Sequence, residues 1–293
     1  MDHFERSGLR FDVLDSGAPT PGTPEPETVV LLHGFPQQPS TFAAVSTLLQ
    51  QAGVRTLVPS QRGYTPTARP RHRRDYRTEE TVADVVALLD AAGLARAHVV
   101  GHDWGGFQAW GLGAWHPERI ASLTVLSTPH PAALSESLRV STQGLQSSYM
   151  ALFQLPFLPE ALAARTLART LRDTRLPLRY VGRYCDAMAE PGALTGALNW
   201  YRGIPFSAGL PLAGRLPVAQ RLPMANRPTV GPALVPTTYV WGRHDFALGR
   251  AAAERTEQHV HAPYAFVELD AGHWLPETEV EAVTEAVLNR VRG

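Results

Sequence analysis

What this sequence lacks already excludes several kinds of protein. Its 293 residues contain one cysteine, Cys185, so the chain cannot form an internal disulfide and a cysteine-based metal site is not expected. Lysine is absent, and the 27 arginines balance 27 acidic residues to a formal net charge of zero. This balance offers no overall attraction to nucleic acid or to an anionic membrane surface. Neither is therefore expected as a partner.

Long apolar runs are also missing. No stretch approaches the roughly 20 apolar residues that a membrane span needs. The charged segment MDHFERSGLRFDVLD at the start of the chain has no apolar core of the kind found in secretory signal peptides. We therefore expect a soluble, cytoplasmic protein. The length and the 44% hydrophobic content suit one large domain, or a core with an inserted subdomain.

Strand and helix patterns alternate along most of the chain. Alternating or continuous apolar runs predict strands at 9–15, 28–34, 54–60, 96–101, 120–128, 237–242 and 264–269. Amphipathic spacing predicts helices at 40–53, 77–93, 104–118, 249–259 and 277–291. Strands that alternate with helices predict an α/β fold with a mostly parallel sheet and helices on both of its faces.

The alternation stops between residues 131 and 225. This segment has helix-like patterns with many prolines and arginines, and no strong strand pattern. We predict that 131–225 is a helical lid inserted into a sheet domain. Residues 1–130 would form the first part of that domain and 226–293 the second part.

The stretch VVGHDWGG, residues 99–106, indicates chemistry. A strand enters it, a tight turn follows Gly101, and a helix leaves at Trp104. In such a strand–turn–helix unit the residue at the turn is strained and its side chain stands above the sheet. Many hydrolases have a serine there. Here the residue is Asp103, so a carboxylate occupies the position of a nucleophile.

A nucleophile in this position needs a base and an acid that orients the base. His273 lies in the loop after the last strand, and Asp245 follows the strand before it. In a parallel sheet both loops open at the same edge as the Asp103 turn. The chain order of nucleophile, acid and histidine is a known order for catalytic triads. We therefore predict a triad of Asp103, Asp245 and His273.

Other ionisable residues fit these roles less well. His259 and His261 come just before a strand, which places them at the opposite edge of the sheet. Asp270 is the main rival of Asp245, but it stands at the end of a strand. The turn HGFP, residues 33–36, would present the backbone N–H of Phe35. Together with the N–H of Trp104, this group would form an oxyanion hole.

Five motifs together resemble the epoxide hydrolases of the α/β-hydrolase fold. They are HGFP, the RGY of residues 62–64, GHDWGG, an acid after the next-to-last core strand, and GHW. The resemblance spans nearly the whole chain. The sequence departs from the family at Ser60, where the family often has an acid. The resemblance implies an α/β-hydrolase fold and a cis peptide bond between Phe35 and Pro36.

The inserted segment extends the resemblance. SYMALFQLP, residues 148–156, and NWYRG, residues 199–203, are similar to the two lid segments that carry ring-opening tyrosines in that family. The resemblance maps those tyrosines to Tyr149 and Tyr201. The wall of the substrate pocket is expected to contain Phe35, Pro36, Trp104, Phe153 and Trp274.

The implied reaction converts a small-molecule epoxide and water to a vicinal diol. Asp103 would form an ester with the substrate while Tyr149 and Tyr201 assist ring opening. His273, oriented by Asp245, would then activate the water that hydrolyses the ester. The reaction requires no metal and no organic cofactor. Nothing in the sequence selects an oligomeric state.

Three other functions share some of these features. A haloalkane dehalogenase uses the same aspartate, but it typically has Asn where this chain has Phe35, and a pair of lid tyrosines is unexpected there. A carboxylester hydrolase would need a serine in place of Asp103. A non-catalytic small-molecule receptor on a hydrolase fold would not require the triad.

Overall fold

The computed structural model describes residues 1–17, 26–140, 152–155, 157–204 and 230–293. Within these ranges eight strands form one sheet, in the order β1-β2-β4-β3-β5-β6-β7-β8. The strands are β1 (His3–Arg6), β2 (Leu9–Asp15), β3 (Thr28–Leu32), β4 (Arg55–Pro59), β5 (Ala97–His102), β6 (Ile120–Leu126), β7 (Thr237–Gly242) and β8 (Tyr264–Leu269). The strands from β4 to β8 are parallel, and β1 and β2 add an antiparallel edge.

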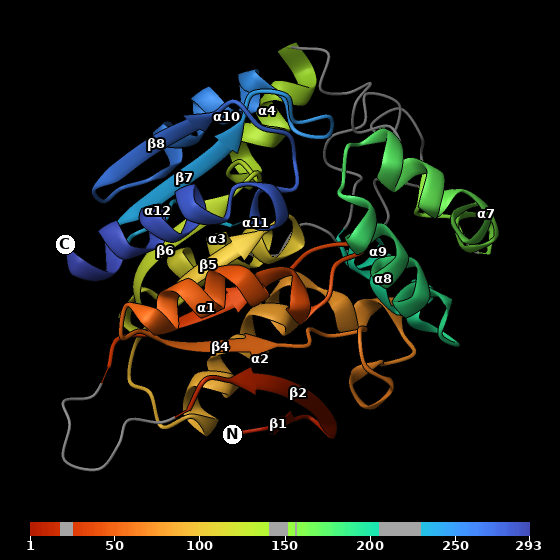
Figure 1. Ribbon diagram of the computed structural model, residues 1–293, viewed down its shortest axis with the longest axis horizontal. Helices are drawn as coiled ribbons and strands as arrows, with labels where there is room; N and C mark the ends of the chain where they lie inside the picture. Colours follow the sequence, from red (N-terminus) through yellow and green to blue (C-terminus); the bar gives the residue numbers. More distant parts are fainter. Residues whose placement is uncertain (18–25, 141–151, 156, 205–229) are drawn as a thin grey trace, which may run out of the picture.

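Helices cover both faces of this sheet (Figure 1). The helices of the described residues, including those that lie beside the sheet, are α1 (Ala43–Gln51), α2 (Thr78–Ala91), α3 (Trp104–Trp115), α4 (Pro131–Val140), α7 (Leu158–Asp173), α8 (Leu178–Ala189), α9 (Ala193–Gly203), α10 (Arg250–Arg255), α11 (Leu275–Thr278) and α12 (Val280–Arg292). Short 3₁₀ turns are η1 (Pro39–Phe42), η2 (Pro66–Ala68), η3 (Arg73–Tyr76), η4 (Pro117–Arg119) and η8 (Thr256–His259). None of the helices described here is both long and apolar enough to cross a membrane.

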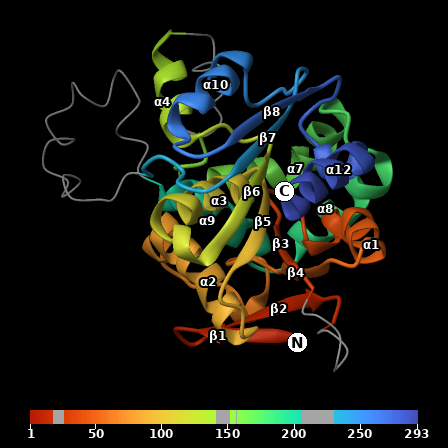
Figure 2. The ribbon, with the colours of Figure 1, turned by 90° about the vertical axis from the view of Figure 1, so that its left-hand side faces the viewer.

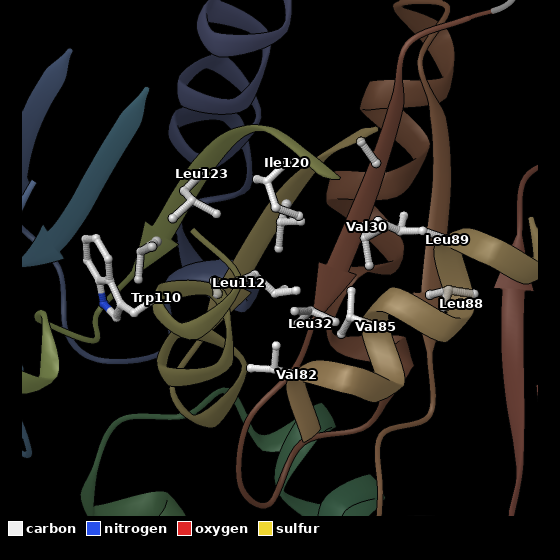
Figure 3. Close-up of a cluster of buried hydrophobic side chains, with 14 of the residues drawn as sticks. Val30, Leu32, Val82, Val85, Leu88, Leu89, Trp110, Leu112, Ile120 and Leu123 are labelled. Atoms are coloured by element: carbon white, nitrogen blue, oxygen red, sulfur yellow. The ribbon is translucent and has the colours of Figure 1, made fainter. Parts of the chain in front are cut away.

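The side chains of β3 show how the two cores are built. Successive residues of a strand point to opposite faces of its sheet. Val30 and Leu32 accordingly pack with residues of α2 and α3 on one face, as Figure 3 shows. Val29 and Leu31 pack with residues of α1 and α12 on the other face. All four side chains have no exposed surface, which explains why the sequence there is continuously apolar.

The predicted strands are all present, and those at 237–242 and 264–269 agree with β7 and β8 to the residue. Strand β1 is absent from the prediction, because its four residues, HFER, contain only one strongly apolar side chain. β1 and β2 form a hairpin whose turn residues, Ser7 and Gly8, have φ of 52° and 75°. The Ser-Gly pair just before the alternating segment could have indicated a hairpin turn, and with it the preceding strand.

The helices between β6 and β7 do not form a single group. α7, α8 and α9 lie together beside the sheet, drawn in green in Figure 1, whereas α4 lies beside α10 (Figure 2). α9 touches the loop before α2 so closely that a Cβ atom on Gly196 would overlap the backbone of Gly63. The indole of Trp200 also donates a hydrogen bond of 2.7 Å to the carbonyl of Arg62. α9 is therefore fastened directly to the sheet domain.

Arg62 of the RGY motif is held in a buried ion pair. Its Nε and Nη2 donate to the two carboxylate oxygens of Asp84 in α2, at 2.8 and 2.7 Å. Arg6 also donates to Asp84, at 2.9 Å. Since removing one partner of a buried pair leaves an uncompensated charge, this cluster constrains how α2 and the 62–64 loop meet.

Asp84→Ala is expected to lower the free energy of unfolding by about 3–5 kcal/mol, because Arg62 stays buried without its partner. Denaturant titration would measure the change. The matched control is Asp90→Ala, which breaks an ion pair with Arg119 in which the Asp90 side chain is 64% exposed. That loss should stay within about 1 kcal/mol. Equal effects of the two substitutions would contradict the assigned role of burial.

Candidate active site

Asp103 stands at a sharp turn between β5 and α3. Its φ of 53° and ψ of −117° lie in a region that residues other than glycine rarely adopt, so the backbone there is strained. A hydrogen bond stabilises the turn, because the hydroxyl of Thr128 donates to the carbonyl of Asp103 at 2.7 Å. On the other side, a Cβ atom on Gly34 would overlap the Asp103 side chain. The loop after β3 therefore lies directly against the Asp103 carboxylate.

The three predicted triad residues meet at the carboxyl edge of the sheet. Nδ1 of His273 lies 2.8 Å from Oδ2 of Asp245, and Nε2 of His273 lies 3.7 Å from Oδ2 of Asp103. The other oxygen of Asp245 accepts backbone N–H groups of Ala247 and Leu248, at 2.8 and 3.0 Å. Asp245 is thus fixed by the loop after β7, and the ring of His273 lies between two carboxylates.

These contacts set the charges of the site. Burial disfavours a charged imidazole, but the charges of Asp245 and Asp103 and the hydrogen bond to Asp245 outweigh it and raise the pKa of His273 to about 10. Burial likewise disfavours a charged carboxylate, yet the neighbouring His273 lowers the pKa of Asp103 below its ordinary value. Both shifts favour an ionised Asp103 next to a protonated His273.

The HGFP turn presents a backbone donor to Asp103. The N–H of Phe35 lies 2.8 Å from Oδ1 of Asp103. The peptide between Phe35 and Pro36 is cis, which confirms the expectation from the resemblance. The turn itself is held by Tyr64, whose hydroxyl donates 3.0 Å to the carbonyl of Gly34. Tyr64 was not singled out in the sequence, although it belongs to the RGY motif.

Tyr201 reaches the site from α9. It is 4% exposed and packs edge-to-face on Trp104, Phe35 and Phe153, with ring centroids 4.6, 5.7 and 4.8 Å apart. Phe35 donates its backbone N–H to Asp103 and Trp104 follows Asp103 in the chain, so the Tyr201 ring lies near the Asp103 turn. The other expected tyrosine, Tyr149, lies outside the described residues.

The remaining expected pocket residues occupy two places. Pro36 is buried next to Phe35 in the HGFP turn. Trp274 is 4% exposed and packs on the ring of His273, with centroids 5.2 Å apart. Its indole donates 3.1 Å to the hydroxyl of Thr174, just after α7. Trp274 therefore lies against His273 and joins it to the end of α7.

The rivals considered from sequence lie elsewhere. The side chain of Asp270 is 68% exposed and pairs with Arg243 and His244. His259 stacks on His130, with ring centroids 4.8 Å apart. Across the residues described, no group of three or more His, Cys, Asp or Glu side chains is arranged to hold a metal ion.

Buried polar residues that the sequence patterns did not single out surround the site. The carbonyl of His273 lies 2.8 Å from Nε2 of His102 and accepts the hydroxyl of Ser127, also at 2.8 Å. Gln37 accepts the N–H of Gly34 at 2.8 Å. His102 lies within GHDWGG and Gln37 directly follows HGFP, and these positions were the only signal in the sequence.

Comparison with known proteins agrees with this fold. A family model described as alpha/beta hydrolase fold matches residues 27–280. The chain is 31% identical over 274 residues to AB hydrolase superfamily protein YfhM of Bacillus subtilis, with 90% of each chain covered. It is 30% identical over 332 residues to Epoxide hydrolase A of Mycobacterium tuberculosis, covering 99% of this chain and 96% of that protein.

Among solved structures, Epoxide Hydrolase A from Mycobacterium thermoresistibile superposes with a TM-score of 0.77 at 25% identity. The match covers 99% of this chain and 97% of that chain. The chain therefore belongs to the α/β-hydrolase fold family and, within it, to the epoxide hydrolases.

Asp103→Asn is expected to lower the pKa of His273 below about 10, because the substitution removes one of the two negative charges beside the ring. An NMR titration of the ring nitrogens of His273 would measure the shift. Asp90→Asn, which changes an exposed carboxylate on α2, should leave the titration unchanged. An unaltered His273 titration in Asp103→Asn would show that the two side chains do not interact in solution.

Proposed function

We propose that this enzyme hydrolyses epoxides to vicinal diols through a covalent ester of Asp103. This proposal rests on the carboxylate of Asp103 at the strained turn. Its Oδ1 lies 2.8 Å from the Phe35 N–H, and its Oδ2 lies 3.7 Å from Nε2 of His273. Family membership and a site built around an aspartate support this reaction over attack by a serine.

Ring opening is the first half of the proposed reaction. One carboxylate oxygen of Asp103 attacks a saturated carbon of the epoxide, and the bond from that carbon to the ring oxygen breaks. The ring oxygen leaves as an alkoxide and takes a proton from a phenol. Tyr201 and Tyr149 are the proposed donors. The position of Tyr201, against Trp104 and Phe35, supports its part in this step.

Ester hydrolysis is the second half. Alkylation turns the Asp103 carboxylate into a neutral ester, which removes one cause of the raised pKa of His273. His273 then gives up its proton more readily, and the phenolate left by ring opening takes that proton. The neutral ring can accept a proton from water, while Asp245 keeps it oriented. The water oxygen adds to the ester carbonyl carbon. The N–H groups of Phe35 and Trp104 would stabilise the resulting oxyanion, and the diol leaves with an oxygen of Asp103.

We also propose that residues 131–225 act as a lid over this site, between core segments 1–130 and 226–293. The contacts of Tyr201 in α9 with Phe35 and Trp104 support this division. The wall beside Asp103 combines aromatic rings from the insertion and from the sheet domain, as a pocket for an apolar epoxide requires.

His273→Gln is expected to permit alkylation and block ester hydrolysis. The protein should then gain the mass of the substrate, which intact-mass spectrometry would detect. The double variant Asp103→Asn, His273→Gln is the control and should gain no mass. In the wild type, a single turnover in ¹⁸O-labelled water should place label in Asp103 and leave the first diol unlabelled. Label in the first diol would indicate direct attack by water and overturn the ester mechanism.

A haloalkane dehalogenase is the second candidate, and one observation favours it. Within the residues described, the buried indole N–H of Trp104 has no hydrogen-bond partner. A halide leaving from the carbon that Asp103 attacks could accept that N–H. Such a reaction needs no proton from a phenol, so the two functions differ in their dependence on Tyr201.

Tyr201→Phe is expected to slow the opening of styrene oxide by about a hundredfold, since a lost donor to a developing oxyanion costs about 3 kcal/mol. Tyr264→Phe, at the start of β8, is the matched control and should have no effect. Turnover of a bromoalkane by the wild type is expected to be low. Bromide release that is unaffected by Tyr201→Phe, without any diol from the epoxide, would assign the protein to the dehalogenases.

A further inference from the structure

A buried carboxylate outside the triad joins the insertion to the sheet domain. Glu277 in α11 is 2% exposed and lies four residues after His273. Its Oε1 accepts hydrogen bonds from Thr41, Tyr184 and Gln37, at 2.6, 2.7 and 2.8 Å. Tyr184 comes from α8 and has no exposed surface. A hydroxyl from the insertion is therefore bound inside the core, next to the helix that follows the proposed base.

The hydrogen bonds continue from Glu277 to the HGFP turn. Gln37 lies between them, and its orientation is fixed because the backbone N–H of Gly34 can only donate. Oε1 of Gln37 must therefore face Gly34, at 2.8 Å, which turns its amide nitrogen towards Glu277 and Thr41. Gly34 precedes Phe35, whose N–H lies 2.8 Å from Asp103. Glu277 thus supports the peptide that carries the proposed oxyanion donor.

A second set of contacts leads towards the backbone of His273. His102 lies 2.8 Å from Oε1 of Gln37 through Nδ1 and 2.8 Å from the carbonyl of His273 through Nε2. Burial lowers the pKa of His102 to about 3, so the ring is neutral and its single N–H can donate to only one of these two acceptors. The continuous hydrogen-bonded path from Glu277 is therefore the one that runs through Gln37 to the N–H beside Asp103.

We propose that Tyr184 and Glu277 are positioning residues for ester hydrolysis, acting through Gln37. The N–H at the end of this path serves the second half of the reaction, in which water attacks the ester carbonyl. The ring of Phe35 packs on Tyr201, whose proposed role belongs to ring opening, but the path reaches Phe35 through its backbone and not through that ring. Loss of the network should therefore slow ester hydrolysis and spare alkylation. This inference rests on the proposed ester mechanism.

Tyr184→Phe tests the proposal with the smallest change, since it removes one hydroxyl from a packed ring. Ester hydrolysis measured by rapid quench on styrene oxide should slow about tenfold, because small displacements of reacting groups are costly. The alkylation rate should be unchanged. In the steady state kcat should fall while kcat/KM is preserved, and the ester should accumulate.

The matched control is Tyr180→Phe, one turn earlier on the same helix, where Tyr180 stacks on Tyr184 at 6.0 Å. Its hydroxyl is not part of the network, so both rates should stay at the wild-type value. Glu277→Gln provides conservative rescue, because a side-chain amide oxygen can still accept the three hydrogen bonds. Glu277→Leu removes the acceptor and should slow ester hydrolysis at least as much as Tyr184→Phe.

The outcomes separate the two proposals. If Tyr184→Phe lowers kcat/KM and leaves ester hydrolysis unchanged, Tyr184 only helps to pack the insertion against the sheet domain. That result would overturn the inference. Equal effects of Tyr184→Phe and Tyr180→Phe would do the same. If His273→Gln accumulates an ester but Tyr184→Phe hydrolyses it at the wild-type rate, only this inference fails. If His273→Gln forms no ester, the proposed mechanism itself fails.

Discussion

The close approach of the HGFP turn to Asp103 is the constraint on which the rest of the site depends. Gly34 has no room for a side chain because the Asp103 carboxylate lies against it, and the next N–H, that of Phe35, points at that carboxylate. The loop after β3 and the turn after β5 must therefore keep a fixed separation. The parallel pairing of β3 with β5 fixes this separation at the ends of the two strands. Gln37 and Tyr64 stabilise the loop through hydrogen bonds to the N–H and the carbonyl of Gly34.

The charge arrangement follows from the same closeness. Two carboxylates and one imidazole share a buried space, and the imidazole lies between them. Burial opposes each charge separately, but the three together are stabilised by their mutual attraction. Any event that neutralises one carboxylate therefore changes the proton affinity of the ring. The charge of Asp103 and the protonation of His273 are therefore coupled through a separation of 3.7 Å.

The sequence alone predicted most of the sheet and the meeting of Asp103, Asp245 and His273, because those features depend on local patterns. Apolar periodicity marks buried strands, and parallel strands bring the loops at their carboxyl ends together. Contacts between side chains of distant segments leave no such pattern. Gln37 and Glu277 are 240 residues apart and bond at 2.8 Å, yet neither lies in a recognisable pair. Tyr184 likewise resembles any tyrosine of an amphipathic helix.

The tight contact between α9 and the sheet domain has a consequence for how molecules reach Asp103. Gly196 touches the backbone of Gly63, and Trp200 is hydrogen-bonded to Arg62, so α9 cannot swing outwards as a rigid body without breaking both attachments. The helix that carries Tyr201 is therefore attached to the sheet domain at two points. In the proposed reaction, substrate has to reach Asp103 without an outward swing of α9 as long as these attachments stay intact.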